Sequence, residues 1–244
     1  MTTQRHADQI VVISGGAAGI GRAMVERLVD GGARVAVLDT AVTAGTAEGD
    51  RVLGVRCDIA DPAAVRAARD QVIEHFGAVN ALVHCAAHQV RRRFEELTEQ
   101  DWRRTMSVNV DGAFHLLDSF LPAMKRAGWG RVVLVTSSSY YAPPPGMTHY
   151  IASKGALQGM VRGLADELGE HRITINALAP GLTRTEAALA KLPEEFFAEI
   201  ASHQAIKRNG EPGDQAAALS FLLSRDADFM TGQTLLVDGG EGRV

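Results

Sequence analysis

The sequence predicts an α/β fold in three layers, a doubly wound parallel sheet of seven strands with helices on both faces. Short apolar runs rich in β-branched residues alternate along the chain with longer helical patterns, which is typical of β-α-β units. The strand runs are continuously apolar, which indicates a sheet buried on both faces. At 244 residues, 46% of them hydrophobic, length alone allows one or two domains. Because these units follow one another without a linker, we expect one domain over residues 1–244.

Seven runs are predicted to be strands, and small or polar residues follow most of them. They cover residues 10–13, 35–38, 52–55, 81–83, 132–135, 173–175 and 234–237. Ligands of doubly wound sheets bind beyond the carboxyl ends of the strands. The residues that follow the strands are therefore the candidates for a functional site.

Helices are predicted between these strands from their start and stop signals. They cover residues 20–30, which end at two glycines, residues 62–76, which open with Asp-Pro, a long helix from the capping-box sequence Thr98-Glu99-Gln100-Asp101 toward Gly128, and residues 148–169. Residues 182–210 form a long insertion with apolar positions. The insertion predicts either a lid over a substrate or an amphipathic helix packed permanently on the domain.

Composition excludes several classes of protein. The formal net charge of −4 argues against a general nucleic-acid binder. The longest apolar runs are far shorter than the ~20 residues that span a bilayer, and residues 1–9 lack the apolar centre of a signal peptide. Two cysteines make no disulfide scaffold. We therefore expect a cytoplasmic protein without nucleic-acid or membrane partners.

A glycine-rich turn, Ser14-Gly15-Gly16-Ala17-Ala18-Gly19-Ile20-Gly21, joins the first strand to the first helix. Glycine permits positive φ and lets the backbone approach a phosphate closely. The helix that follows presents unpaired N–H groups and a positive dipole to an anion. The turn therefore predicts a pyrophosphate site, although the glycines alone would also suit an ordinary tight turn.

Asp39 ends the second strand 18 residues after Gly21, where an acid that binds a ribose is expected. Its carboxylate can accept hydrogen bonds from ribose hydroxyls and would repel a 2′-phosphate. We therefore predict NAD(H) rather than NADP(H), with Arg22 and Arg34 as the cations that would argue against this choice. Asp58, at the end of the third strand, suits either a contact with adenine or the N-cap region of the helix that opens at Pro62.

Tyr150 and Lys154 are four residues apart and share one face of a predicted helix. A free tyrosine has a pKa of about 10, so positive charge nearby is needed to make it an acid–base near neutral pH. Ser137, which follows the fifth strand, is placed to hydrogen-bond the same substrate oxygen.

Together these motifs resemble the short-chain dehydrogenase/reductase family over essentially the whole chain. Gly15 to Gly21 match its TGxxxGxG turn, with Ser14 in place of threonine, and Tyr150 and Lys154 match its YxxxK. Further similar segments are Val108 to Gly112, Asn176 to Gly181, and Thr231 to Gly240. The resemblance implies a Rossmann fold and hydride transfer between a nicotinamide cofactor and a substrate that carries an alcohol or carbonyl group.

The resemblance also implies roles for individual residues. Tyr150 would exchange the proton, Lys154 would hold the nicotinamide ribose and lower the pKa of the tyrosine, Ser137 would orient the carbonyl, and Asn109 would hold a water that links Lys154 to solvent. The expected cofactor site comprises Gly15, Ala18, Gly19, Ile20, Gly21, Asp39, Asp58, Ile59, Ala86, Tyr150, Lys154, Pro180, Gly181, Thr183 and Thr185.

One segment departs from the family. His84-Cys85-Ala86-Ala87 stands where Asn-Asn-Ala-Gly is usual, which puts a structural hydrogen bond in doubt. With His88 the segment has the spacing of metal ligands, but no further Cys or His cluster completes a site, so we expect no metal.

For the substrate, three stretches are similar to the bacterial 1-phenylethanol dehydrogenase type of the family. They are Gly128 to Arg131, Thr148 to Ile151, and Thr231 to Leu235. They favour a secondary alcohol and its ketone, with Ser137, His88, Tyr140 and Tyr150 as substrate contacts. The alternatives are a 3-oxoacyl-[acyl-carrier-protein] reductase and a non-catalytic NAD-sensing regulator; the Tyr150 to Lys154 spacing disfavours an enoyl reductase. Since the family usually forms homotetramers, we expect a homotetramer.

Overall fold

One sheet organises the computed structural model, which describes residues 4–43 and 47–242. Its parallel strands are β1 (Ile10–Ser14), β2 (Arg34–Asp39), β4 (Val52–Arg56), β5 (Ala81–His84), β6 (Gly130–Val135), β7 (Ile173–Pro180) and β8 (Thr234–Val237), in the spatial order β4-β2-β1-β5-β6-β7-β8. The seven predicted strands are confirmed. A two-residue strand, β3 (Ala47–Glu48), adds to β4 in antiparallel orientation at the sheet edge. Residues 1–3, 44–46 and 243–244 of the expected domain lie outside the described residues.

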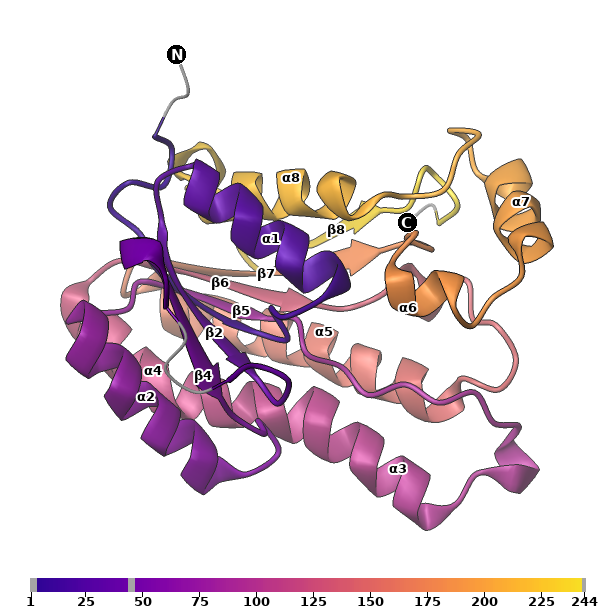
Figure 1. Ribbon diagram of the computed structural model, residues 1–244, viewed down its shortest axis with the longest axis horizontal. Coiled ribbons are helices and arrows are strands. Elements are labelled where there is room, and N and C mark those ends of the chain that lie inside the picture. Colours follow the sequence, from indigo (N-terminus) through magenta and orange to yellow (C-terminus); the bar gives the residue numbers. More distant parts are fainter. Residues whose placement is uncertain (1–3, 44–46, 243–244) are drawn as a thin grey trace.

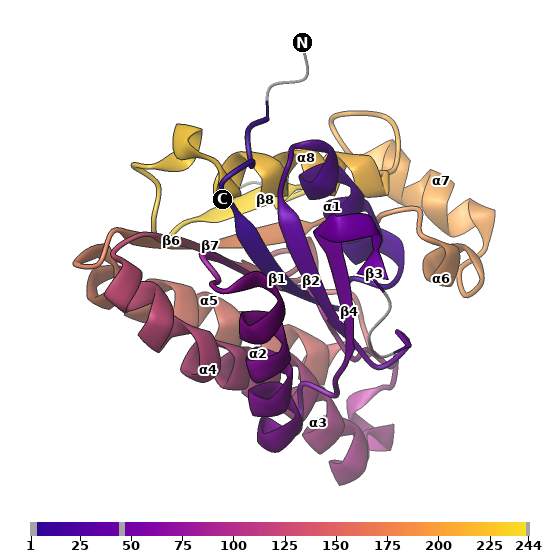
Figure 2. The ribbon, with the colours of Figure 1, turned by 60° about the vertical axis from the view of Figure 1, so that its left-hand side comes forward.

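Helices cover both faces of the sheet (Figures 1 and 2). The helices α1 (Gly19–Asp30) and α8 (Pro212–Leu223) lie side by side on one face, and α2 (Pro62–Phe76), α4 (Gly112–Ala127) and α5 (Thr148–Gly169) cover the other. The predicted bounds of α2 and α5 are confirmed. The helix α8 was not predicted, although Pro212 stands at its first turn, a favoured position for proline.

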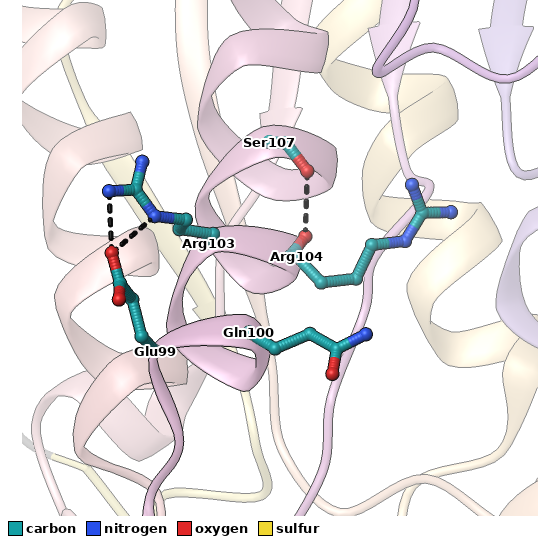
Figure 3. A pocket seen from close by; sticks show the side chains of 5 residues that line it. All are labelled: Glu99, Gln100, Arg103, Arg104 and Ser107. Carbon is teal, nitrogen blue, oxygen red and sulfur yellow. Dashed lines mark hydrogen bonds and ion pairs between the residues drawn. The ribbon is translucent and has the colours of Figure 1, made fainter.

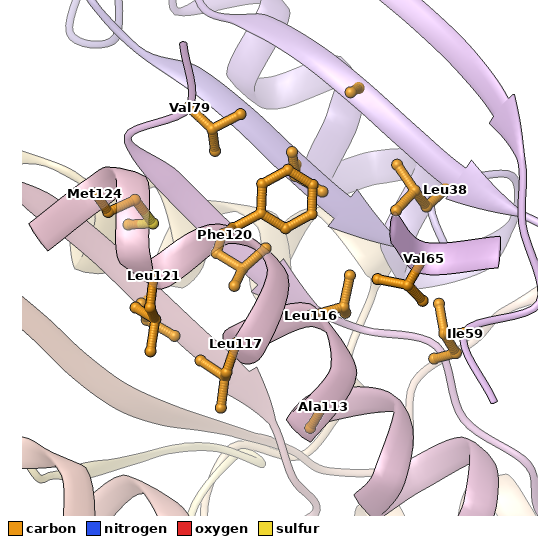
Figure 4. Packing of buried hydrophobic residues seen from close by; sticks show 14 of the residues in the cluster. Leu38, Ile59, Val65, Val79, Ala113, Leu116, Leu117, Phe120, Leu121 and Met124 are labelled. Carbon is orange, nitrogen blue, oxygen red and sulfur yellow. The ribbon is translucent and has the colours of Figure 1, made fainter. Parts of the chain in front are cut away.

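The core lies in two clusters, one on each side of the sheet. In β1, Ile10 and Val12 belong to one cluster, and Val11 and Ile13 belong to the other. This division explains the continuously apolar strand, because each face of it meets a helical layer. Figure 4 shows part of the larger cluster, in which α4 side chains such as Phe120 pack among residues of other elements.

The long helix predicted from Thr98 is present but not uniform. Thr98 accepts a hydrogen bond from the backbone N–H of Asp101 at 3.1 Å, as expected for a capping box. The helix α3 (Glu99–Met106) then continues through a π-helical turn, η3 (Ser107–Asp111), into α4. Such widened turns often occur at functional sites, and this one contains Asn109.

The insertion at residues 182–210 forms two helices, α6 (Glu186–Leu189) and α7 (Glu194–His203), at the edge where β7 ends (Figure 1). A β-bridge between Thr183 and Gly210 closes its base. Phe197 is fully buried, and Arg184 lies over its ring at 4.8 Å. The helix α7 is thus packed on the domain through Phe197, whereas Leu189 of α6 is 44% exposed.

Short 3-10 turns complete the described chain. They are η1 (Gly49–Arg51), η2 (Phe94–Glu96), η4 (Ser138–Tyr140) and η5 (Arg225–Ala227). None of the helices in the described ranges has the length and apolar character needed to cross a membrane.

Candidate active site

The polar residues that end the strands gather along one edge of the sheet. Ser14, Asp39 and His84 are the last residues of β1, β2 and β5, and β1 pairs in parallel with both of the others. Parallel strands end at a common edge, so the expected placement of the candidate residues is present.

The glycine-rich turn depends on its glycines. Gly15 and Gly19 have φ angles of +72° and +54°, which favour glycine. A Cβ on Gly15 would lie 2.6 Å from the backbone of Ala86, and one on Gly21 would lie 2.0 Å from the carbonyl oxygen of Gly15. The turn is therefore held tightly against α1 and against the segment after β5.

The start of α1 suits an anion. Its N-cap, Ala18, offers no side-chain acceptor, and its first turn contains no acidic residue. Backbone N–H groups at such a helix end have no intrahelical partner. The residues present thus fit the pyrophosphate of a dinucleotide.

Asp39 is held beside this turn. One carboxylate oxygen accepts a hydrogen bond from the N–H of Ala17 at 3.2 Å, and the other accepts one from Ala41 at 3.0 Å. Arg22 pairs instead with Glu26 at 2.9 Å. Arg34 begins β2, at the opposite end of the strand from Asp39. Among the described residues, neither of these two arginines forms an ion pair with Asp39.

Asp58 does not cap the helix after β4. The N-cap of α2 is Asp61, whose side chain accepts from the N–H of Ala63 at 2.8 Å. Asp58 accepts from the N–H of Ala60 and pairs with Arg104 of α3 at 3.3 Å. The capping interpretation of Asp58 is therefore wrong, and a contact with adenine stays a prediction. The side chain of Ile59 is buried against Gly112, and its carbonyl oxygen lies 2.9 Å from Nδ1 of His115, so its backbone N–H is the group left for a cofactor.

Tyr150, Lys154 and Ser137 meet in a buried site. The side chain of Ser137 is near enough to Tyr150 to lower the pKa of the tyrosine by hydrogen bonding, and its Oγ accepts from the backbone N–H of Ser139 at 3.2 Å. The Nζ of Lys154 lies 5.3 Å from the centre of the tyrosine ring and donates to the carbonyl oxygen of Val135 at 2.8 Å. Lys154 is 1% exposed and Tyr150 is 9% exposed. Tyr150 and Lys154 thus share one face of α5, as predicted, and Ser137 lies next to the tyrosine.

Burial controls the protonation of this site. It raises the pKa of Tyr150 to about 12, against the lowering effect of the Ser137 hydrogen bond. It also lowers the pKa of Lys154 to about 8. In the protein alone, desolvation of the phenolate is the largest cause of the raised pKa of Tyr150 and Lys154 is not among its causes, so the lowering of this pKa by Lys154 stays a prediction.

Asn109 lies in the π-helical turn and is fully buried. Its side-chain oxygen accepts from the N–H of His88 at 2.7 Å, and its Nδ2 donates to the carbonyl of His88 at 3.1 Å and to Oγ of Ser153 at 2.9 Å. Ser153 in turn donates to the carbonyl of Tyr150 at 2.6 Å. The side chain of Asn109 thus connects the segment after β5 to α5, so the expected water would bind the second lone pair of its backbone carbonyl, which also lies 3.0 Å from Nε2 of His84. The spacing i, i+3 from Tyr150 was the available signal for Ser153, which sequence reasoning missed.

His84 makes hydrogen bonds at the position where the family usually has an asparagine. It is 1% exposed, with Nδ1 at 3.0 Å from Oγ of Ser14 and Nε2 at 3.0 Å from the carbonyl oxygen of Asn109. Burial, reinforced by the charge of Lys154, lowers its pKa to about 3. Both ring nitrogens are engaged within the protein, and no group of three potential metal ligands occurs among the residues described.

The segment after β7 closes the other side of the site. Pro180 ends β7, and a Cβ on Gly181 would meet Asp238 at 2.7 Å. The hydroxyl of Thr183 donates to the carbonyl of Gly181 at 3.0 Å. Thr185 caps α6, and its side chain lies beside Gly19 of the glycine-rich turn. This contact brings the start of the insertion directly onto the expected cofactor site.

The two further candidates for substrate contact lie at the margins of the site. His88 is half-buried, and its Nδ1 is 3.3 Å from Oγ1 of Thr105 on α3. Tyr140 is 41% exposed, and its ring fills the space where Gly155 of α5 would carry a side chain. Residues five apart on a helix are about 140° apart around its axis, so Tyr140 packs on a different face of α5 from that of Tyr150.

A separate hollow of about 580 Å³ lies on α3, lined by Glu99, Gln100, Arg103, Arg104 and Ser107 (Figure 3). Glu99 and Arg103, one turn apart on α3, form an ion pair in its lining. None of the predicted site residues lines it.

Comparison with known proteins gives consistent matches along the chain. Residues 15–241 match the family model described as enoyl-(acyl carrier protein) reductase. A probable galactose dehydrogenase of Rhizobium meliloti is 33% identical over 242 residues, covering 96% of this chain and 94% of that protein. A 3-oxoacyl-[acyl-carrier-protein] reductase of Mycobacterium bovis is 34% identical, covering 95% and 92%. The structure of a short-chain dehydrogenase/reductase from Serratia marcescens superposes with a TM-score of 0.88 at 31% identity, covering 98% of this chain and all of that one.

Proposed function

The chain belongs to the short-chain dehydrogenase/reductase family of oxidoreductases, and from this premise we propose that it transfers a hydride between NAD(H) and a secondary alcohol or its ketone. The observation that carries the proposal is the joint burial of Tyr150 and Lys154, with the Lys154 ammonium 5.3 Å from the centre of the tyrosine ring and Ser137 beside the tyrosine. A carbonyl oxygen placed against both hydroxyls would receive two donors.

Each residue has a defined task in this reaction. With its pKa at about 12, Tyr150 is a phenol at neutral pH and can donate its proton to the carbonyl oxygen. Lys154, with a pKa of about 8, is mainly an ammonium at that pH and stabilises the phenolate that forms. Ser137 stabilises charge on the reacting oxygen. When bound, the nicotinamide supplies or accepts the hydride.

NAD(H) is favoured by Asp39. Its carboxylate, fixed by Ala17 and Ala41, stands beside the turn where the ribose hydroxyls of adenosine are expected. Arg56 pairs in register with Asp39 across β2 and β4 and is the cation to test against this choice. The ratio of kcat/KM with NADH and NADPH, measured for the wild type and for Arg56→Ala, decides the assignment. A wild-type preference for NADPH would contradict it, and loss of that preference in Arg56→Ala would identify Arg56 as the cation responsible.

For the substrate, we propose an uncharged secondary alcohol and ketone, aromatic or otherwise apolar, as in the 1-phenylethanol dehydrogenase type. The relatives named above are a probable galactose dehydrogenase and a 3-oxoacyl-[acyl-carrier-protein] reductase, and the second of them makes a 3-oxoacyl reductase the second candidate. The matched family model is described as an enoyl reductase, but the spacing of Tyr150 and Lys154 on one helix face favours a carbonyl oxygen as the proton acceptor.

The deciding experiment is a screen of alcohols, ketones, sugars and 3-oxoacyl thioesters that follows NADH absorbance. Turnover of an apolar ketone supports the proposal, and turnover confined to sugars or to acyl thioesters would replace the substrate class. Binding of NADH without turnover of any compound would favour the remaining alternative, a non-catalytic NAD-sensing regulator.

We further propose a cytoplasmic homotetramer whose insertion at residues 182–210 acts as a substrate lid. Trp102 of α3 and Phe114 of α4 are exposed aromatic side chains, and they support assembly through the helix that α3, η3 and α4 form together. Cys57 and Cys85 form no disulfide, as suits a reducing compartment. Sedimentation at several concentrations tests the assembly.

A further inference from the structure

His84 links the two halves of the site. Its Nε2 lies 3.0 Å from the carbonyl oxygen of Asn109, which can only accept a hydrogen bond, so Nε2 carries the ring proton. In the neutral ring, Nδ1 is then an acceptor, and the hydroxyl of Ser14 donates to it. The contacts thus determine both the tautomer of His84 and the direction of the Ser14 hydroxyl.

Ser14 connects His84 to the glycine-rich turn. Because its proton points to His84, its lone pairs face the backbone N–H groups of Cys85 and Ala86, at 3.2 and 3.3 Å. Ala86 is the residue whose backbone packs against Gly15 of the glycine-rich turn. The position of the turn relative to the segment after β5 therefore depends on the Ser14 hydroxyl.

Asn109 connects His84 to the helix that carries Tyr150. The carbonyl oxygen that His84 holds belongs to the residue whose side chain reaches Ser153, and Ser153 donates to the backbone of Tyr150. One continuous set of hydrogen bonds thus runs from the glycine-rich turn to the catalytic helix, with His84 at its centre.

We propose that His84 is a positioning residue for the proposed hydride transfer, which aligns the cofactor turn through Ser14 and the Tyr150 helix through Asn109. The inference rests on the proposed function. His84 remains neutral because burial and the charge of Lys154 hold its pKa far below the usual range. It therefore transfers no proton itself, and the tautomer with hydrogen on Nε2 is the working form.

Two amide substitutions separate the two ends of the link. In His84→Asn the amide oxygen takes the place of Nδ1 and keeps the Ser14 bond, but the side chain is too short to reach Asn109. In His84→Gln the amide nitrogen takes the place of Nε2 and keeps the Asn109 bond, but it offers no acceptor to Ser14. Ser14→Ala breaks the Ser14 bond from its other partner, and His75→Gln, the same substitution at an exposed histidine of α2, is the matched control.

The experiment measures the Kd of NADH by fluorescence and kcat at saturating cofactor for all four variants. We expect His84→Asn to lower kcat about tenfold with the Kd unchanged, and His84→Gln and Ser14→Ala to raise the Kd about tenfold with little change in kcat. The double variant of Ser14→Ala and His84→Gln should bind no more weakly than either single one, because both remove the same bond. His75→Gln should behave as the wild type.

An equal loss of kcat and of affinity in all of these variants would overturn the proposal, because it would indicate only general destabilisation. Nitrogen chemical shifts of the His84 ring give a readout independent of turnover. A neutral ring with hydrogen on Nε2 is expected at about pH 5.5, and a protonated ring or the other tautomer overturns the proposal. If the wild type bound neither NADH nor NADPH, the proposed function itself would fail and the positioning role with it. If the wild type bound NADH and catalysed turnover but the variants did not divide as described, only the role of His84 would fail.

Discussion

Replacing Lys154 by methionine should stabilise the fold at neutral pH while abolishing turnover. The amine is 1% exposed, and burial lowers its pKa from 10.5 to about 8. Since one pKa unit corresponds to about 1.4 kcal/mol, the charged amine costs the folded state about 3 kcal/mol. Methionine has a similar length and no charge, and it loses the hydrogen bond to Val135, which is worth about 1 kcal/mol. We expect Lys154→Met to gain about 2 kcal/mol at pH 7.

The pH dependence of this gain is the sharper prediction. Below about pH 8, Lys154 is charged in both the folded and the unfolded chain, and the full cost is present. Between about pH 8 and 10.5 the folded chain loses the proton first, so the wild type gains stability relative to the variant. Above that range the advantage of the variant should be gone.

Urea unfolding at pH 7 and near pH 10, at equal protein concentrations, measures both effects. Lys191→Met is the control, because this lysine is exposed on the segment between α6 and α7 and its replacement should change stability little at either pH. A variant that is less stable than the wild type at pH 7, or a difference that does not change with pH, would refute the reasoning.

Three further outcomes follow from other contacts. Gly21→Ala places a Cβ 2.0 Å from the carbonyl oxygen of Gly15 and should abolish NADH binding, whereas Gly159→Ala, which meets open space, should leave it intact; fluorescence titration compares them. Asp39→Ala should lower the ratio of kcat/KM for NADH over NADPH by about tenfold, since a charged hydrogen-bond acceptor is lost; an unchanged ratio would remove Asp39 from cofactor selection. The pKa of His84 is about 3 in the folded chain and 6.5 in the unfolded chain. The wild type should therefore lose stability as the pH falls from 6.5 to 3, and His84→Gln should lose about 5 kcal/mol less. Acid unfolding followed by circular dichroism measures this, and the same loss of stability in both proteins would contradict it.

The sequence predicted most of the framework, because strands and helices leave periodic patterns. The seven parallel strands and the bounds of α2 and α5 are present as predicted. The two-residue strand β3 is too short to carry a pattern. The π-helical turn at Ser107–Asp111 was invisible because its residues also suit an ordinary helix. Start and stop signals in the sequence thus locate helices and strands better than they locate irregular turns within them.

For the candidate site, sequence motifs identified side chains but not their environments. Tyr150, Lys154 and Ser137 lie together as their spacing suggested. The pKa of Tyr150 went in the unexpected direction because its burial depends on segments far apart in the chain. The role of His84 was hidden for the same reason, since its partners Ser14 and Asn109 are 70 and 25 residues away.

The most direct test of the central claim compares the wild type with Tyr150→Phe. The variant keeps the ring and loses only the hydroxyl that is proposed to exchange the proton. NADH-dependent reduction of an apolar ketone and the Kd of NADH are measured for both proteins. We predict that the variant loses turnover by a factor of at least about 10², while it binds NADH as tightly as the wild type. Turnover by Tyr150→Phe at the wild-type rate would contradict the assignment of Tyr150 as the acid–base.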